Sequence, residues 1–452
     1  MWGRLQPARD FSPALLLILA PLLAAAPTGD PRLIEAVQRR DPRAVEALLK
    51  AKSDPNSTTG DGASALAWAV HIGNRRMAEL LLASGAKPDA ANEYGETPLT
   101  LACLNGDGAM VESLLKAGAN AKSARWNGET ALMIAAGAGS VDAVKSLIAH
   151  GAEVNVAESR KKQTALMWAA AEGHAPVVRA LLEKGADPNA RSAAGFSPLL
   201  FAAIKNDTAS VKALLDAKVD PNENPKGVAP PLLAAASNRG TQSAIALVEA
   251  GANPNVADQA SGNTPLHLAA QNGDIPLAKA LLAKGASIEA RTANIPQRGF
   301  FRIPVGQTPL FLAARAGHIE MMRLLLESGA DPKSKAPDGG SFLMASVGSA
   351  KVEAVRFAYQ YDNDVKVATS DGATLMHASV TGTSNGAMLD AQLRVCEVIQ
   401  FLAGKGAPLD EKNATGRTPI DIADILPIDK AVDLLTKLIL DSGAKPKSPS
   451  KR

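Results

Sequence analysis

Short apolar runs recur along this chain in a pattern that returns about every 33 residues. In each period, Thr-x-Leu or Thr-Pro-Leu opens a first run, a Gly-rich turn closes it, and a second run follows with a leucine pair such as Leu81-Leu82 or Leu281-Leu282. About 21 residues after each Thr-Pro-Leu stands a Gly-Ala-Asp-Pro-Asn segment or a relative of it, as at 185–189. Each period therefore predicts two short helices, and a period of this length indicates a solenoid.

The ends of the predicted helices carry residues that have a physical reason to stand there. Thr ahead of Pro suits a helix start, because the hydroxyl accepts backbone N–H groups and Pro fits the first turn. Glycines such as Gly85, Gly185 and Gly329 stop the second helix where a left-handed residue is needed. The stretch from Asp-Pro-Asn to the next Asn-Gly or Asp-Gly predicts a turn between short extended pieces.

Counted in this register, the chain holds about twelve units. We expect them at about 30–60, 61–93, 94–126, 127–160, 161–193, 194–226, 227–260, 261–304, 305–337, 338–370, 371–414 and from 415 onward. Because each unit of a solenoid packs only on its neighbours, 452 residues do not require several globular domains. Aromatic residues at 4% and hydrophobic residues at 46% fit a core of Ala and Leu.

The repeat resembles the ankyrin repeat family. Its Thr-Pro-Leu-His-x-Ala-Ala signature is complete at 264–270 and nearly complete in most other units, and the resemblance covers residues 30–443. It implies an all-α solenoid of stacked helix–turn–helix units with projecting hairpins, in which the two terminal units are polar caps. It also implies a protein-binding scaffold, because members of this family bind other proteins on the concave face formed by hairpin tips and first helices.

The distribution of charge bears on the class of partner. Of the formal net charge of +3, the first 26 residues hold +1 and the tail from Lys445 holds +4, which leaves −2 for the body. A nearly neutral body argues against a nucleic-acid partner, because that affinity comes mainly from neutralising phosphates. The tail, residues 444–452, is rich in Lys, Pro and Ser and is expected to be disordered.

Residues 1–26 are typical of a secretory signal peptide. A basic n-region precedes the apolar run 14–20, Pro21 interrupts it, and the small residues 24–26 offer a cleavage region. The run is too short for a membrane-spanning helix, which needs about 20 apolar residues. We expect a periplasmic or secreted bacterial protein that acts as a monomer. The alternative is a membrane-tethered form that keeps an uncleaved N-terminal segment.

The repeat also accounts for the residues that could carry chemistry. His267 and His377 occupy the signature histidine position, for which the resemblance implies structural hydrogen bonding, and the other four histidines lie in turns or at helix ends. No Cys-x-x-Cys or His-Glu-x-x-His spacing predicts a metal site. Cys103 and Cys396 fall in distant units, so we expect two unbridged thiols. We therefore expect no enzymatic activity and no catalytic, metal-binding or cofactor-binding residue.

Partner contacts are predicted at hairpin tips and in one inserted loop. The predicted contact residues are Tyr94, Glu96, Trp126, Glu129, Lys161, Phe196, Arg298, Phe300, Phe301 and Arg302. Tyr94, Trp126 and Phe196 place three rings at tips in a chain with few aromatics, and Tyr, Trp and Arg dominate interface hot spots. The alternative is that these rings pack on the neighbouring hairpin. By contrast, Trp68, Trp168 and Phe201 precede the paired small residues of the first helices and are expected in the core.

Two insertions of about 11 residues break the period. The first, residues 291–304, widens a hairpin, and insertions in repeat arrays often map to the binding face. Its alternative is a loop folded back over its own hairpin, and a further rival function is an enzyme or regulator that uses this loop. The second, near 381–390, is expected to be a flexible, neutral connection. The unit at 338–370 departs most from the signature, so we expect 338–414 to be the least stable part.

Overall fold

In the computed structural model, the chain can be described at residues 28–224, 227–293, 306–382 and 388–447. These residues form 24 helices and a few isolated β-bridges, with no strand among them. The chain divides into two compact units, Met1–Pro231 and Leu232–Arg452. Each unit is a stack of helix pairs, which confirms the predicted all-α architecture.

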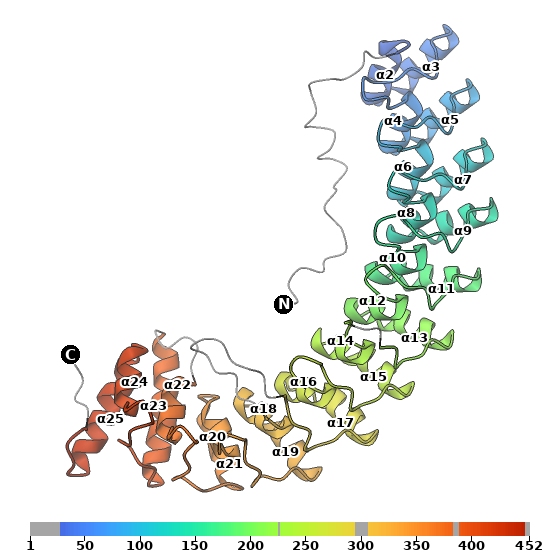
Figure 1. Cartoon of the computed structure of the whole chain (residues 1–452). Coiled ribbons are helices and arrows are strands. Elements are labelled where there is room, and N and C mark those ends of the chain that lie inside the picture. The colour runs from blue at the N-terminus through green and yellow to red at the C-terminus, as the bar shows by residue number, and fades with distance from the viewer. Residues whose placement is uncertain (1–27, 225–226, 294–305, 383–387, 448–452) are drawn as a thin grey trace. The chain divides into compact units, whose positions relative to one another are not determined.

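The N-terminal unit contains six pairs of antiparallel helices (Figure 1). The first helices are α2 (Pro31–Gln38), α4 (Ala65–His71), α6 (Pro98–Leu104), α8 (Ala131–Gly137), α10 (Ala165–Glu172) and α12 (Pro198–Lys205). The second helices are α3 (Pro42–Lys50), α5 (Arg75–Ala83), α7 (Gly108–Lys116), α9 (Val141–Ala149), α11 (Ala175–Glu183) and α13 (Thr208–Asp216). The first helices form one row and the second helices form another beside it.

The C-terminal unit repeats this arrangement. Its first helices are α14 (Pro231–Ser237), α16 (Pro265–Asn272), α18 (Pro309–Ala316), α20 (Phe342–Val347), α22 (Leu375–Thr381) and α24 (Pro419–Ile425). Its second helices are α15 (Thr241–Glu249), α17 (Ile275–Ala283), α19 (Ile319–Glu327), α21 (Val352–Tyr359), α23 (Leu389–Gly404) and α25 (Asp429–Asp441). The core of each unit consists mainly of Ala, Leu, Val and Met side chains between successive pairs.

The helices begin and end at the residues that the repeat predicts. The hydroxyl of Thr97 accepts a hydrogen bond from the N–H of Thr100 (3.2 Å), and Pro98 occupies the first position of α6. At the end of α5, Gly85 has φ +91°, which lets the N–H of Ala86 reach the carbonyl of Leu81 (3.0 Å). A left-handed glycine followed by this bond is a common helix end, because it satisfies carbonyl groups that the helix leaves unpaired.

Asparagines at the last position of the Asp-Pro-Asn segment or its relatives, here Glu-Val-Asn at 153–155 and Asn-Pro-Asn at 253–255, tie one repeat to the next. Asn155 donates its amide to the carbonyl of Gly185 (3.0 Å) and accepts from the N–H of Asp187 (2.8 Å). Asn255 makes the same pair of bonds to Gly285 and Ser287 in the C-terminal unit. Because each asparagine forms hydrogen bonds with backbone groups of the turn one period later, it fixes the spacing between neighbouring units.

The aromatic residues of the first helices lie less deep than predicted. Trp68, Trp168 and Phe201 are partly exposed, because the position before the paired small residues lies at the edge of the helix. Trp168 nevertheless packs closely on the preceding repeat: a methyl group added at Gly137 would lie 3.0 Å from its Cε3. Trp168 therefore packs between repeats, and all three side chains present part of their surface to solvent.

Two features of the C-terminal unit depart from the regular repeat, in which a glycine with positive φ ends the second helix. Asp362 and Asn363 do not adopt a left-handed backbone, and the buried Asp362 carboxylate accepts a hydrogen bond from the N–H of Leu343 (2.9 Å) at the start of α20. The middle of the second insertion, residues 383–387, lies outside the described residues, so the expected flexible connection stays a prediction. The insertion's last two residues, Leu389 and Asp390, begin α23, which is 16 residues long, whereas most second helices have nine.

Candidate protein-binding surface

The hairpin tips of the N-terminal unit are shaped by polar side chains. At residues 92–96, the Asn92 side chain accepts hydrogen bonds from the N–H groups of Tyr94 (3.0 Å) and Glu96 (2.9 Å). The backbone closes over the same five residues, because the N–H of Asn92 donates to the carbonyl of Glu96 (3.0 Å). This tight turn directs the Tyr94 side chain outward.

Trp126 is the most exposed large hydrophobic side chain among the described residues. It is 76% exposed, and Tyr94 on the preceding tip is 37% exposed. The two tips are in contact, since a methyl group added at Gly95 would lie 3.1 Å from the backbone nitrogen of Trp126. The Tyr94 hydroxyl is hydrogen-bonded to Glu93, which raises the tyrosine pKa. Two predicted contact rings thus stand on neighbouring tips.

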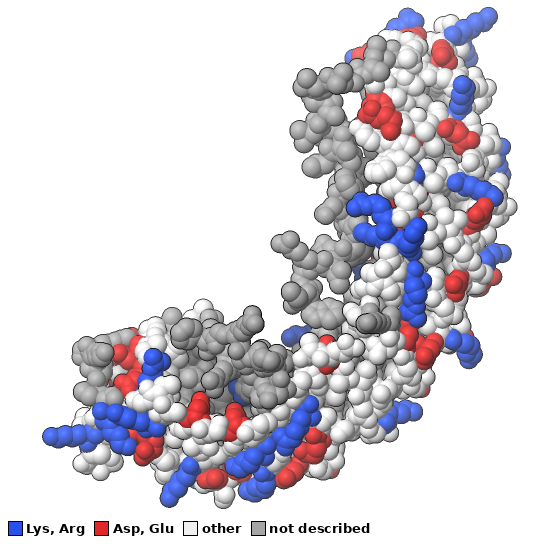
Figure 2. All heavy atoms as spheres, in the orientation of Figure 1, with Lys and Arg blue, Asp and Glu red and all other residues white. Residues whose placement is uncertain are grey.

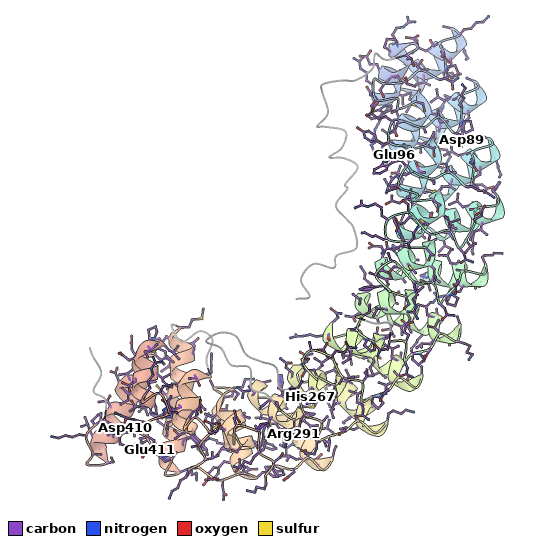
Figure 3. All side chains as sticks on the ribbon, viewed as in Figure 1. Asp89, Glu96, His267, Arg291, Asp410 and Glu411 are labelled. Carbon is purple, nitrogen blue, oxygen red and sulfur yellow. The ribbon has the colours of Figure 1, made fainter. Side chains whose placement is uncertain are left out.

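Glu96 and Glu129 both form ion pairs with Arg125, a residue that the sequence analysis did not single out. Arg125 pairs with Glu96 (2.8 Å) and with Glu129 (3.1 Å), and all three side chains are about one fifth exposed. Figure 3 shows Glu96 on the side of the first helices, whereas Asp89 lies toward the second helices. The three charged groups form a bridge between two tips, and they hold the backbone next to Trp126.

The next tip, residues 158–163, carries three consecutive exposed cations, Arg160, Lys161 and Lys162. Its centre is the buried carboxylate of Glu158, which accepts from the N–H groups of Arg160 (2.7 Å), Lys161 (2.7 Å) and Gln163 (3.0 Å). Figure 2 shows Lys and Arg side chains gathered over this part of the N-terminal unit. Among the residues predicted to contact a partner, Lys161 belongs to this cationic tip.

Phe196 packs on the first helix of its own unit, a contact that neither the predicted interface nor the alternative of packing on the neighbouring hairpin named. Its ring is partly buried and lies 5.5 Å from the ring of Phe201 in α12, at an interplanar angle of 36°. It therefore contributes to packing at the tip and offers a partner less surface than Trp126 does.

The four predicted contacts in the inserted loop, Arg298, Phe300, Phe301 and Arg302, lie outside the described residues. The base of that loop is described, and Arg291 holds it (Figure 3). Its guanidinium donates to the carbonyls of Gly306 (3.0 Å) and Lys335 (3.0 Å) and to Ser334 Oγ (2.7 Å). The insertion thus leaves the repeat from a base that is bonded to the next hairpin.

The histidines take part in the repeat framework. His267 bonds through Nδ1 to the N–H of Thr264 (3.1 Å) and through Nε2 to the carbonyl of Gln307 (3.0 Å). His377 makes the equivalent bonds to Thr374 and Arg417. Burial lowers the pKa of both histidines, because the imidazolium ion loses hydration inside the protein. These side chains bridge consecutive repeats, as the resemblance implied.

The two cysteines are free. Cys103 is fully buried, and burial raises the pKa of its thiol to about 12. Cys396 is partly exposed, and partial burial raises its pKa as well. In the part of the chain that the structure describes, His, Cys, Asp and Glu side chains form no group of three or more suited to a metal ion. Within the same residues, no helix has the length and apolarity needed to cross a membrane.

An exposed apolar cluster in the C-terminal unit was not predicted. Met388, Leu389 and Leu393 are at or near the start of α23, and Ile425 and Leu426 lie at the end of α24. The two segments are neighbours, because the Gln392 side chain bonds to the carbonyl of Pro427 (3.4 Å) and to the N–H of Lys430 (3.1 Å). The only feature of the sequence that pointed to this cluster was the second insertion, because Met388 and Leu389 fall within it.

Stacked helix pairs with projecting hairpin tips define a repeat protein whose accessible features lie on an extended surface. A family model described as ankyrin repeats, three copies, matches residues 33–125, 105–192, 199–292, 232–336 and 310–393. These matches cover most of the chain, so it belongs to the ankyrin repeat family. Ankyrin repeats are generally protein–protein interaction modules, and proteins built from them are typically non-enzymatic scaffolds. No curated protein matches the chain.

Proposed function

We propose that this protein is an exported scaffold that binds a protein partner through the hairpin tips and first helices of its N-terminal unit. The observation that carries the proposal is Trp126, a large aromatic side chain held 76% exposed on a tip whose backbone is braced by the Arg125 ion pairs. Keeping such a ring in water has no benefit for folding, whereas Trp is enriched at interface hot spots. Tyr94 and Lys161 extend the surface over the adjacent tips.

Binding is favoured over catalysis because the residues that could carry chemistry have structural partners. His267 and His377 hold neighbouring repeats together, and the Glu96 and Glu129 carboxylates are paired with Arg125. The nearly neutral body favours a protein over a nucleic acid as the partner. We propose a monomer without cofactor or metal.

The test is affinity capture with the purified mature protein, comparing the unchanged chain with Trp126→Ala and with Tyr94→Ala. Loss of the same captured protein from both variants is the expected result. Lys212→Ala, on the exposed face of α13, serves as the control and should capture normally. Equal capture by all four proteins would contradict the assignment of the surface.

The exported location rests on the N-terminal segment alone. A basic start, an apolar run and a stretch of small residues support cleavage near residues 24–27 and release into the periplasm or medium. N-terminal sequencing of the protein recovered from cells distinguishes this from tethering. A mature chain that begins after the apolar run supports release, whereas an intact residue 1 in the membrane fraction supports the tethered form.

A further inference from the structure

The tip at 158–163 differs from the other tips of the N-terminal unit in length and conformation. Its backbone closes between Glu158 and Gln163 (3.0 Å), one residue more than the closures at 92–96, 125–129 and 192–196. The left-handed position of this tip is occupied by Lys162, with φ +55°, where the neighbouring tips have Gly95, Gly128 and Gly195. A lysine in this conformation is less favourable than glycine, and such local strain is concentrated at functional sites.

The extra residue and the strained lysine place three cations side by side in water. Arg160, Lys161 and Lys162 are all exposed, and Glu158, the carboxylate nearest to them in sequence, is buried with its oxygens bonded to the backbone of the same tip. No ion pair of the described residues includes any of these three cations. The tip is therefore a preformed cationic surface.

This cationic tip is attached directly to the tip that carries Trp126. Ser159 donates both its N–H (3.2 Å) and its hydroxyl (2.5 Å) to the carbonyl of Asn127, the residue after Trp126. On the other side, the N–H of Ala193 donates to the carbonyl of Lys161 (2.7 Å). The exposed indole and the three cations thus belong to one braced surface.

Charge changes sign across Trp126. Glu93 and Glu96 belong to the Tyr94 tip and Glu129 to the Trp126 tip, and Arg125 pairs with Glu96 and Glu129. In the tip at 158–163, by contrast, Glu158 is buried and the exposed charged side chains are the three cations at 160–162. A polyphosphate that covered the whole surface would meet the acidic half, so the pattern fits a ligand with anionic groups at one end only.

We infer that the surface made by Tyr94, Trp126, Arg160, Lys161 and Lys162 binds an extended protein segment in which a cluster of Asp or Glu residues adjoins a large apolar side chain. The apolar side chain packs on Trp126, and the carboxylates pair with the three cations. This inference rests on the proposed function, because it specifies the partner of the same tips. Arg also offers a carboxylate two parallel hydrogen bonds, which makes the tip suited to this group.

The experiment is a selection of short random peptides displayed on phage against the full mature chain. We expect the selected peptides to be enriched in Asp and Glu next to an aromatic or large aliphatic residue. The triple variant Arg160→Gln/Lys161→Gln/Lys162→Gln should bind them about tenfold more weakly, because three exposed charge pairs each contribute a fraction of 1 kcal/mol. Their affinity for the unchanged protein should fall as salt rises.

A matched control carries Lys145→Gln, Arg179→Gln and Lys212→Gln, which also remove two lysines and one arginine that are exposed, on α9, α11 and α13. This control should bind as the unchanged protein does. Peptides whose binding depends on Trp126 but which lack acidic residues and tolerate the triple variant would overturn the inference and leave the proposed function intact. Peptides indifferent to Trp126→Ala would overturn both.

Two other probes test whether the cationic tip binds phosphate groups and not carboxylates. Single-stranded DNA and vesicles containing phosphatidylglycerol are tested against the same proteins. We expect neither to show binding that the triple variant removes. Binding of either probe that is lost in the triple variant and kept in the control would overturn the inference in favour of a phosphate ligand.

Discussion

Trp126 and Trp168 show how the same residue type serves two roles in one repeat array. Trp126 lies on a hairpin tip with three quarters of its surface in water, whereas Trp168 lies in α10 against Gly137 of the preceding repeat. The difference follows from their positions in the repeat. The side chain of Trp126 is left largely uncovered at its tip, whereas Trp168, in a first helix, meets the first helix of the preceding unit.

This difference predicts opposite effects on stability. Trp126→Ala should change the free energy of unfolding by no more than about 0.5 kcal/mol, because little contact is lost. Trp168→Ala should lower it by about 2–3 kcal/mol, at or below the lower end of the range for large buried rings, because part of the indole is exposed. Urea unfolding followed by circular dichroism measures both. A large loss for Trp126→Ala would show that the ring packs within the protein.

The buried histidines predict a pH dependence of the C-terminal unit. Burial lowers the pKa of His267 and His377 below the ordinary value of 6.5, so the unfolded chain binds more protons than the folded chain at mildly acidic pH. Stability is therefore fully present above about pH 7 and falls as pH decreases through 6.5 toward the folded pKa values.

Hydrogen exchange of α16 and α22 between about pH 7.5 and about pH 5.5 measures this effect, after correction for the intrinsic exchange rate. Protection of both helices should decrease at the lower pH. The double variant His267→Gln/His377→Gln should show a weaker dependence, since glutamine does not titrate. An equally steep dependence in both proteins would contradict the assignment to these two groups.

Among the elements, α20 is held by an interaction from outside the repeat pattern. It has six residues, and the buried carboxylate of Asp362 accepts from the N–H of Leu343 near its start. The sequence 362–363 replaces the usual Gly-Ala. In this turn, the Asp362 side chain caps the preceding first helix, α20, and neither residue adopts a left-handed backbone.

We predict that Asp362→Ala lowers the free energy of unfolding by about 1–2 kcal/mol, because a buried helix-capping group is lost. Glu353→Ala, at an exposed position of α21, is the control and should stay within about 0.5 kcal/mol of the unchanged protein. Thermal unfolding of the full chain provides the measurement. Equal values for the two variants would show that the Asp362 carboxylate has no capping role.

Cation–aromatic contacts join the second helices of the same region. The guanidinium of Arg323 in α19 lies 5.1 Å from the ring centre of Phe357 in α21, and that of Arg356 lies 4.8 Å from the ring centre of Phe401 in α23. Lys405 stands over Tyr359 at 5.2 Å. Exposed contacts of this kind stabilise a protein by about 0.5–1 kcal/mol each. They therefore offset part of the stability that this region loses because its sequence departs from the repeat signature.

At the scale of the whole molecule, stability is a sum over units and their neighbours, and it need not be uniform. The segment 338–414 combines the shortest first helix of the described chain with an interruption between α22 and α23. We predict that its amide groups exchange faster than those of 94–193. Hydrogen exchange of the full chain, resolved by peptides, tests this. Equal protection would mean that the cation–aromatic contacts and the Asp362 cap fully compensate.

Much of the fold could be predicted from the sequence, because an ankyrin-type unit is determined by neighbours within one period. Helix starts at Thr-Pro, helix ends at glycine and the structural role of His267 all follow from short-range rules. The depth of Trp68 and Trp168 could not be predicted, since it depends on how far one helix shields another. The Arg125–Glu96 ion pair was missed because it joins side chains of two different tips, which are 29 residues apart in the chain.

The sequence by itself determined the repeat, its register, the helix boundaries and the presence of aromatic and basic residues at tips, since each depends on residues close together along the chain. Only the tertiary structure decided which of these side chains remain accessible. Contacts between residues about one period apart brace the backbone beside the exposed Trp126 and combine the tips at 125–129 and 158–163 into one surface, and packing against Phe201 of its own unit partly covers Phe196. Such contacts depend on three-dimensional packing, which no pattern within a single repeat specifies.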